Sequence, residues 1–143
     1  MSVIHLQRVL AAASASTVLA GAVLAGATAP AAASTGGGCN GPVTGQACVG
    51  VVEADGGAGI VFEVRADLGV RAGSACRLRL LALDETTGVR WDSALVPCDR
   101  RQRQERILPN PTEGHVYRAE LQILPNGKNL DSAESVLSPA LSF

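Results

Sequence analysis

The sequence contains few histidine and aromatic residues. Of its 143 residues, two are histidines, one is tryptophan, one is tyrosine and two are phenylalanine. His5 lies in the apolar N-terminal stretch, which leaves His115 as the one histidine for acid–base chemistry and disfavours most histidine-based catalysis. The four aromatic side chains are needed for a core, so a sugar-stacking platform of exposed rings is also disfavoured.

Excess positive charge is also lacking. The chain has 12 basic and 13 acidic residues and a net charge of −1, which disfavours a body that neutralises nucleic-acid phosphates, and no nucleic-acid partner is expected. No phosphate-binding loop, dinucleotide-binding glycine motif or G-x-S-x-G elbow occurs. We therefore expect no enzyme and no cofactor.

Residues 1–33 have the pattern of a signal peptide. Arg8 precedes an uncharged run rich in Ala, Val and Leu, and the small residues 31–33 match an A-x-A cleavage site. A retained membrane anchor is the alternative, but the run is diluted by small residues and no basic cluster follows it. The pattern predicts cleavage after Ala33, a secreted, extracellular protein and no stable membrane insertion once the leader is removed.

All four cysteines lie after this leader, at positions 39, 48, 76 and 98. An even number of cysteines in a small exported domain indicates disulfides, of which three connectivities are possible. Pairs that tie neighbouring segments are favoured, namely Cys39–Cys48 and Cys76–Cys98. Zinc is the alternative, but there is no C-x-x-C pair and one histidine in this part, so no metal site is expected.

Hydrophobic residues after the leader recur with a period of two. Alternation is clearest in residues 60–67 and 115–124, and further strands are predicted at 47–54, 75–84, 89–96, 103–108 and 135–143. No helical pattern of ten residues occurs there. The chain is therefore predicted to be all-β, an antiparallel immunoglobulin-like sandwich of six to seven strands over residues 47–143, preceded by a mobile Gly-rich segment at 34–46.

One stretch carries a family likeness. In residues 107–121 a hydrophobic residue, a Pro-containing turn and Tyr117 lead into an alternating strand. This passage resembles the corresponding part of fibronectin type III and related immunoglobulin-like domains. The resemblance implies a corner tyrosine at Tyr117, with its ring packed inward and its hydroxyl bonded to the backbone. It implies an architecture and no particular activity.

The one concentrated charge feature is the run 99–106, with arginines at positions 100, 101, 103 and 106. Guanidinium groups bind carboxylates and phosphates bidentately, so Arg100, Arg101, Arg103 and Arg106 are predicted to bind an extracellular protein or an anionic glycan. A solvated edge strand is the alternative.

The sequence leaves three functions open. The first is a secreted, non-catalytic interaction module. The second is a protease inhibitor that presents an arginine loop beside Cys98, because a neighbouring disulfide would stiffen that loop before binding. The third is a small hydrolase that uses His115 as its base.

Overall fold

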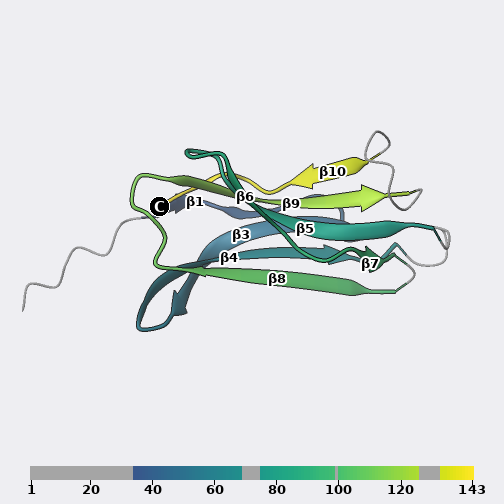
Figure 1. The fold of residues 1–143 in the computed structure, drawn as a ribbon, viewed down its shortest axis with the longest axis horizontal. Helices are drawn as coiled ribbons and strands as arrows, with labels where there is room; N and C mark the ends of the chain where they lie inside the picture. Colours follow the sequence, from purple (N-terminus) through teal and green to yellow (C-terminus); the bar gives the residue numbers. More distant parts are fainter. Residues whose placement is uncertain (1–33, 69–74, 99, 126–132) are drawn as a thin grey trace, which may run out of the picture.

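The computed structural model describes residues 34–68, 75–98, 100–125 and 133–143, so the predicted leader lies outside the described part. Every regular element in that part is a strand, and all strand pairs are antiparallel. The strands form two sheets that face each other (Figure 1). The predicted all-β antiparallel sandwich with two disulfides is thus confirmed.

The smaller sheet has the order β2-β3-β4-β8. Its strands are β2 (Gly38–Asn40), β3 (Gly45–Ala54), β4 (Gly57–Ala66) and β8 (Gln102–Pro109). The larger sheet is built on the central pair β5 (Arg77–Asp84) and β9 (Val116–Leu124). Short strands flank this pair: β1 (Thr35–Gly36), β6 (Val89–Asp92), β7 (Val96–Pro97), β10 (Glu134–Leu137) and β11 (Leu141–Ser142).

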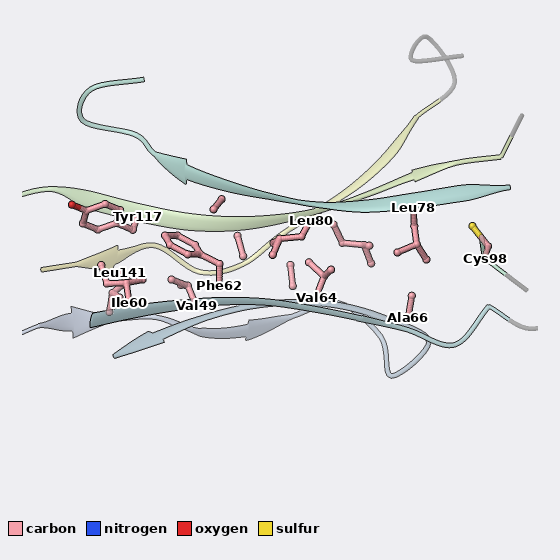
Figure 2. Packing of buried hydrophobic residues seen from close by; sticks show 14 of the residues in the cluster. Val49, Ile60, Phe62, Val64, Ala66, Leu78, Leu80, Cys98, Tyr117 and Leu141 are labelled. Atoms are coloured by element: carbon pink, nitrogen blue, oxygen red, sulfur yellow. The ribbon is translucent and has the colours of Figure 1, made fainter. Parts of the chain in front are cut away.

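The core lies between the two sheets (Figure 2). In β4 the side chains of Ile60, Phe62 and Val64 are buried, because successive residues of a strand point to opposite faces and these three share the inner one. The larger sheet contributes Leu78, Leu80, Tyr117 and other apolar residues from β5 and β9. The alternation predicted for residues 60–67 and 115–124 is therefore confirmed.

Both predicted disulfides are present, and the described part has no free cysteine. Cys76–Cys98 is buried at one end of the core and joins the residue before β5 to the residue after β7. Cys39 and Cys48 are register partners in β2 and β3, so their disulfide crosses directly between adjacent strands. The Cys76–Cys98 disulfide thus lies in the interior, whereas the Cys39–Cys48 disulfide lies on the outer face of the smaller sheet.

The prediction of a single strand over 89–96 is wrong. The segment forms β6 and β7, which pair with successive parts of β5. Between them the Ser93 hydroxyl accepts a hydrogen bond from the Leu80 amide at 2.9 Å, and Gln104 of β8 donates to the carbonyl of Ala94. These side-chain contacts lie beside a main-chain hydrogen bond from the Ser93 amide to the Leu80 carbonyl at 2.8 Å, and together they hold the gap between β6 and β7 against β5 and β8.

The predicted strand 135–143 is also interrupted, between β10 and β11. The buried Ser138 hydroxyl accepts a hydrogen bond from the Ala119 amide at 2.9 Å and donates one to the Pro139 carbonyl. Pro139 has no amide hydrogen for a ladder, which matches its place outside both strands. The two interruptions, together with β1 and β2 near the N-terminal end of the described part, raise its number of strand segments to eleven, above the six to seven expected.

The N-terminal glycine-rich segment differs from its expectation as well. The sequence predicts a Gly-rich entry segment pinned at Cys39 and no strand within 34–46, whereas β1 pairs with β11 and β2 pairs with β3. Gly36, Gly37 and Gly38 have φ between 80° and 109°, which residues with a side chain rarely adopt, so glycine allows the chain to cross from one sheet to the other. The strand expected at 103–108 is present as β8.

Tyr117 has the contacts that the family resemblance implies. Its ring is buried against Phe62, with centroids 6.3 Å apart, and its hydroxyl accepts a hydrogen bond from the Thr112 amide at 3.0 Å. The contact fixes the loop between β8 and β9 to the core.

Candidate functional site

The outer face of the smaller sheet carries rows of side chains that run across its strands. Strand register places Cys48 beside Glu63, and Glu63 beside Glu105. The next row is formed by Gln46, Arg65 and Arg103. Charged groups and a disulfide therefore gather on one solvent-facing surface, although they come from distant parts of the sequence.

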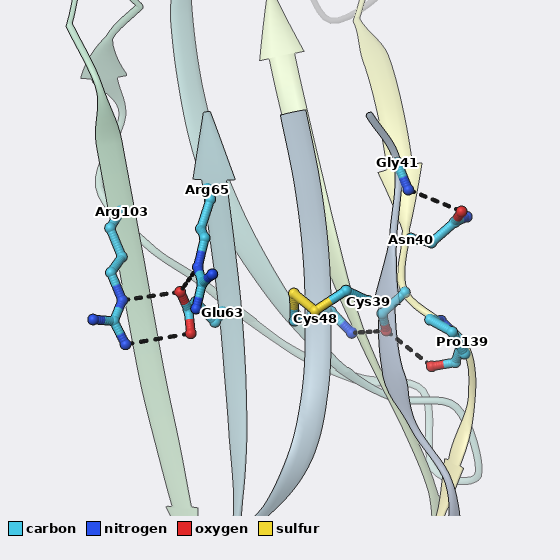
Figure 3. The surroundings of a disulfide bond; sticks show 10 residues. Cys39, Asn40, Gly41, Cys48, Glu63, Arg65, Arg103 and Pro139 are labelled. Atoms are coloured by element: carbon cyan, nitrogen blue, oxygen red, sulfur yellow. Dashed lines mark hydrogen bonds and ion pairs between the residues drawn. A yellow bond between two sulfur atoms is a disulfide. The ribbon is translucent and has the colours of Figure 1, made fainter. Parts of the chain in front are cut away.

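Glu63 is the centre of an ion-pair network on this face (Figure 3). Its side chain is 11% exposed, and it accepts hydrogen bonds from the guanidinium groups of Arg65 and Arg103. The Nε of Arg103 lies 2.9 Å from Glu63 Oε1, while its Nη2 lies 2.8 Å from Glu105 Oε2. The network orients Arg65 and Arg103 from opposite sides of one carboxylate.

The same network shifts the acidity of Glu63. The hydrogen bond from Arg65 is the largest influence, and with the positive charge of Arg103 it outweighs burial and holds the pKa of Glu63 below its ordinary value. Glu63 is therefore ionised at neutral pH.

A depression of about 270 Å³ lies at one end of this face. Three arginines, Arg65, Arg101 and Arg103, line it together with one acid, Asp67. The Nε and Nη2 of Arg101 each donate to Asp67 Oδ2 at 3.2 Å. Val43, which is 87% exposed, adds an apolar wall. The lining is therefore rich in guanidinium donors and net positive.

The four arginines singled out from the sequence do not form one patch. Arg101 and Arg103 line the depression. Arg106 pairs in register with the core residue Phe62, so it projects from the opposite face of β8. Arg100 precedes β8 and is exposed. The alternation of a strand separates residues that are close in the sequence.

Sequence reasoning missed Arg65, Glu63 and Asp67. A signal was present, since Glu63 and Arg65 share the polar face of the strand predicted at 60–67. The contact between Glu63 and Arg103 depends on pairing of β4 with β8, forty residues apart, which a single sequence does not specify.

His115, the candidate catalytic base, is held by an acid. Its Nδ1 lies 2.9 Å from Asp84 Oδ2, while Asp84 Oδ1 accepts the amides of Thr86 and Thr87. Burial acts to raise the pKa of Asp84, but hydrogen bonds from Thr87 and His115 outweigh it and leave that pKa below its ordinary value. In the described part no serine or threonine hydroxyl is hydrogen-bonded to His115 itself, whereas the Thr87 side chain is hydrogen-bonded to Asp84.

Within the described ranges no cluster of three or more histidine, cysteine, aspartate or glutamate side chains could hold a metal ion. No helix in those ranges is long and apolar enough to span a membrane. A second depression, of about 340 Å³, is lined by Val51, Val52 and neighbours at the β3–β4 hairpin.

Comparison of the chain with protein-family models, with curated proteins and with solved structures gives no match. The arrangement of the residues themselves is therefore the basis for a functional proposal.

Proposed function

We propose that this chain is a secreted, non-catalytic β-sandwich module that binds an anionic group of an extracellular glycan or protein in the depression lined by Arg65, Arg101 and Arg103. The convergence of three guanidinium groups on one depression carries the proposal. Arginine forks recognise carboxylates and sulfates through paired hydrogen bonds.

The ion pairs of the depression fit this role. Arg65 uses its Nε for Glu63, and Arg101 uses Nε and Nη2 for Asp67. Terminal nitrogens that these contacts do not use are donors for a ligand. The side chains of Arg65 and Arg103 are 56% and 61% exposed, so they can contact a ligand while their ion pairs with Glu63 fix their orientation. Binding then requires less ordering of long side chains.

The architecture supports an immunoglobulin-like module. The order β3-β4-β8 opposite β5-β9-β10 and the hydrogen bond at Tyr117 both fit that class. Two disulfides favour an oxidising compartment. Secretion is tested by N-terminal sequencing of the exported protein, which should begin at Ser34; recovery of all 143 residues in a membrane fraction would contradict it.

The ligand proposal is tested by calorimetric titration with sulfated and uronic-acid oligosaccharides. We expect the double substitution Arg65→Gln and Arg101→Gln to weaken binding at least about tenfold, which is about 1.4 kcal/mol. Arg90→Gln, on the other sheet, is the matched control and should leave binding unchanged. Added salt should also weaken binding, because it screens exposed charges. Equal binding by the double variant, or no binding by the unaltered protein, would refute the site.

A further inference from the structure

Strand β8 is a long edge strand whose outer side has no partner among the described strands. It spans eight residues and pairs with β4 on one side only. In Figure 1 most of its length runs along the lower border of the molecule, and the end of the β3–β4 hairpin reaches lower at the left. Such an edge can pair with another strand.

Pro109 indicates which main-chain groups face this free edge. Proline has no amide hydrogen, and in sheets it occurs on edge strands with its nitrogen toward solvent. Pro109 pairs in register with Gly59 of β4, so its nitrogen is directed away from β4. Because alternate residues of an antiparallel strand direct their main-chain groups to the same side, Arg103, Glu105 and Ile107 also direct theirs to the free edge.

We propose that β8 pairs antiparallel with β8 of a second copy of this chain, about a two-fold axis at Gln104. Inverting the strand about this residue places Arg103 opposite Glu105 of the second copy, and Glu105 opposite Arg103 of the second copy. Both pairs lie on the outer face, because residues directly opposite in a ladder share a face. Main-chain groups of these residues face the free edge and complete the ladder.

The charge order of β8 favours this partner and register. Arg103 and Glu105 already contact each other within one chain at 2.8 Å, and they are 61% and 38% exposed. An axis at Glu105 would instead place that carboxylate opposite its own copy, which like-charge repulsion disfavours. An edge strand that carries charges of one sign repels a second copy of itself. In β8 the signs differ between Arg103 and Glu105, so each arginine meets a glutamate when the second copy is inverted.

The pairing would join two four-stranded sheets into one continuous sheet with both depressions on the same face. Dimer formation needs only β8, and it is therefore independent of the anionic ligand.

Charge exchange tests the proposal. The full chain, exported by its own leader, is studied by sedimentation equilibrium over a range of concentrations. We expect a dimer for the unaltered protein. Glu105→Arg places arginines opposite each other in both pairs, and Arg103→Glu does the same with carboxylates, so each variant should dimerise at least about tenfold more weakly. Glu113→Arg makes the same charge change in the β8–β9 loop and is the control that should still dimerise.

Mixing the two single variants gives the decisive result. The Arg103→Glu chain carries carboxylates at both positions 103 and 105, whereas the Glu105→Arg chain carries guanidinium groups at both. Each cross-strand pair of a mixed dimer then joins opposite charges, so a mixed dimer should form where neither variant self-associates. Melting curves of each variant establish that it is folded. A monomeric unaltered protein, equal dimerisation of Glu105→Arg and the unaltered protein, or no mixed dimer would each overturn the proposal.

Discussion

Glu63→Gln tests the ion-pair network on the outer face of the smaller sheet. The substitution keeps the size of the side chain and one acceptor oxygen, but it leaves Arg65 and Arg103 without their shared negative charge. A hydrogen bond to a charged group contributes about 1.5–3 kcal/mol. Both guanidinium groups are more than half exposed, so solvent screening reduces the contribution of these contacts below that value. We expect the free energy of unfolding to fall by about 1–2 kcal/mol at pH 7.

The pH dependence gives this prediction its sharper form. Because the folded-state pKa of Glu63 is lowered, its contribution is fully present above the unfolded-state pKa and is lost as the pH falls through the folded value. Urea unfolding at several pH values should show the two proteins converging in acid, where Glu63 is protonated. Glu105→Gln, which loses one exposed contact, should change stability by less than about 0.5 kcal/mol. An equal stability of Glu63→Gln and unaltered protein at pH 7, or a gap that persists in strong acid, would refute the reasoning.

Three other substitutions follow from the contacts of the larger sheet. Tyr117→Phe removes the acceptor of the Thr112 amide and should lower stability by about 1 kcal/mol in urea titrations; no change would mean that the contact contributes little. Replacing Cys76 and Cys98 with alanine removes the cross-link between two residues 22 apart, and the unfolded chain gains conformational entropy. The free energy of unfolding should therefore fall by about 3.4 kcal/mol, measured by thermal unfolding without reductant. Asp84→Asn should destabilise the protein at pH 7, because the pKa of Asp84 is lowered in the folded state. The difference in melting temperature between the variant and the unaltered protein should become smaller as the pH falls. A difference that becomes larger in acid would contradict this reasoning.

The strands that the sequence predicts well are those with different environments on their two faces. Ile60, Phe62 and Val64 face the core while Glu63 and Arg65 face outward, so alternation alone identifies β4. Cysteine pairing was predictable because each pair joins neighbouring segments.

The remaining features depend on contacts that no local pattern records. Glycine has no side chain to alternate, so β1 and β2 left no signal in residues 34–40. The interruption at Ser138 depends on a hydroxyl that reaches the Ala119 amide of another strand. The depression is formed by segments that strand pairing brings together, and so its Arg65 was missed whereas Arg101 and Arg103 were identified.

The disulfide between β2 and β3 also determines how the fold would respond to a pulling force. Thr35 and Ser142 are register partners, so tension on residues 34 and 143 would open the short β1–β11 ladder from one end, one contact after another. On the N-terminal side, extension would then stop at Cys39, because its bond to Cys48 transfers the tension directly to β3. The segment between these cysteines would carry no tension, and residues 48–54 of β3, which pair with β4, would resist next.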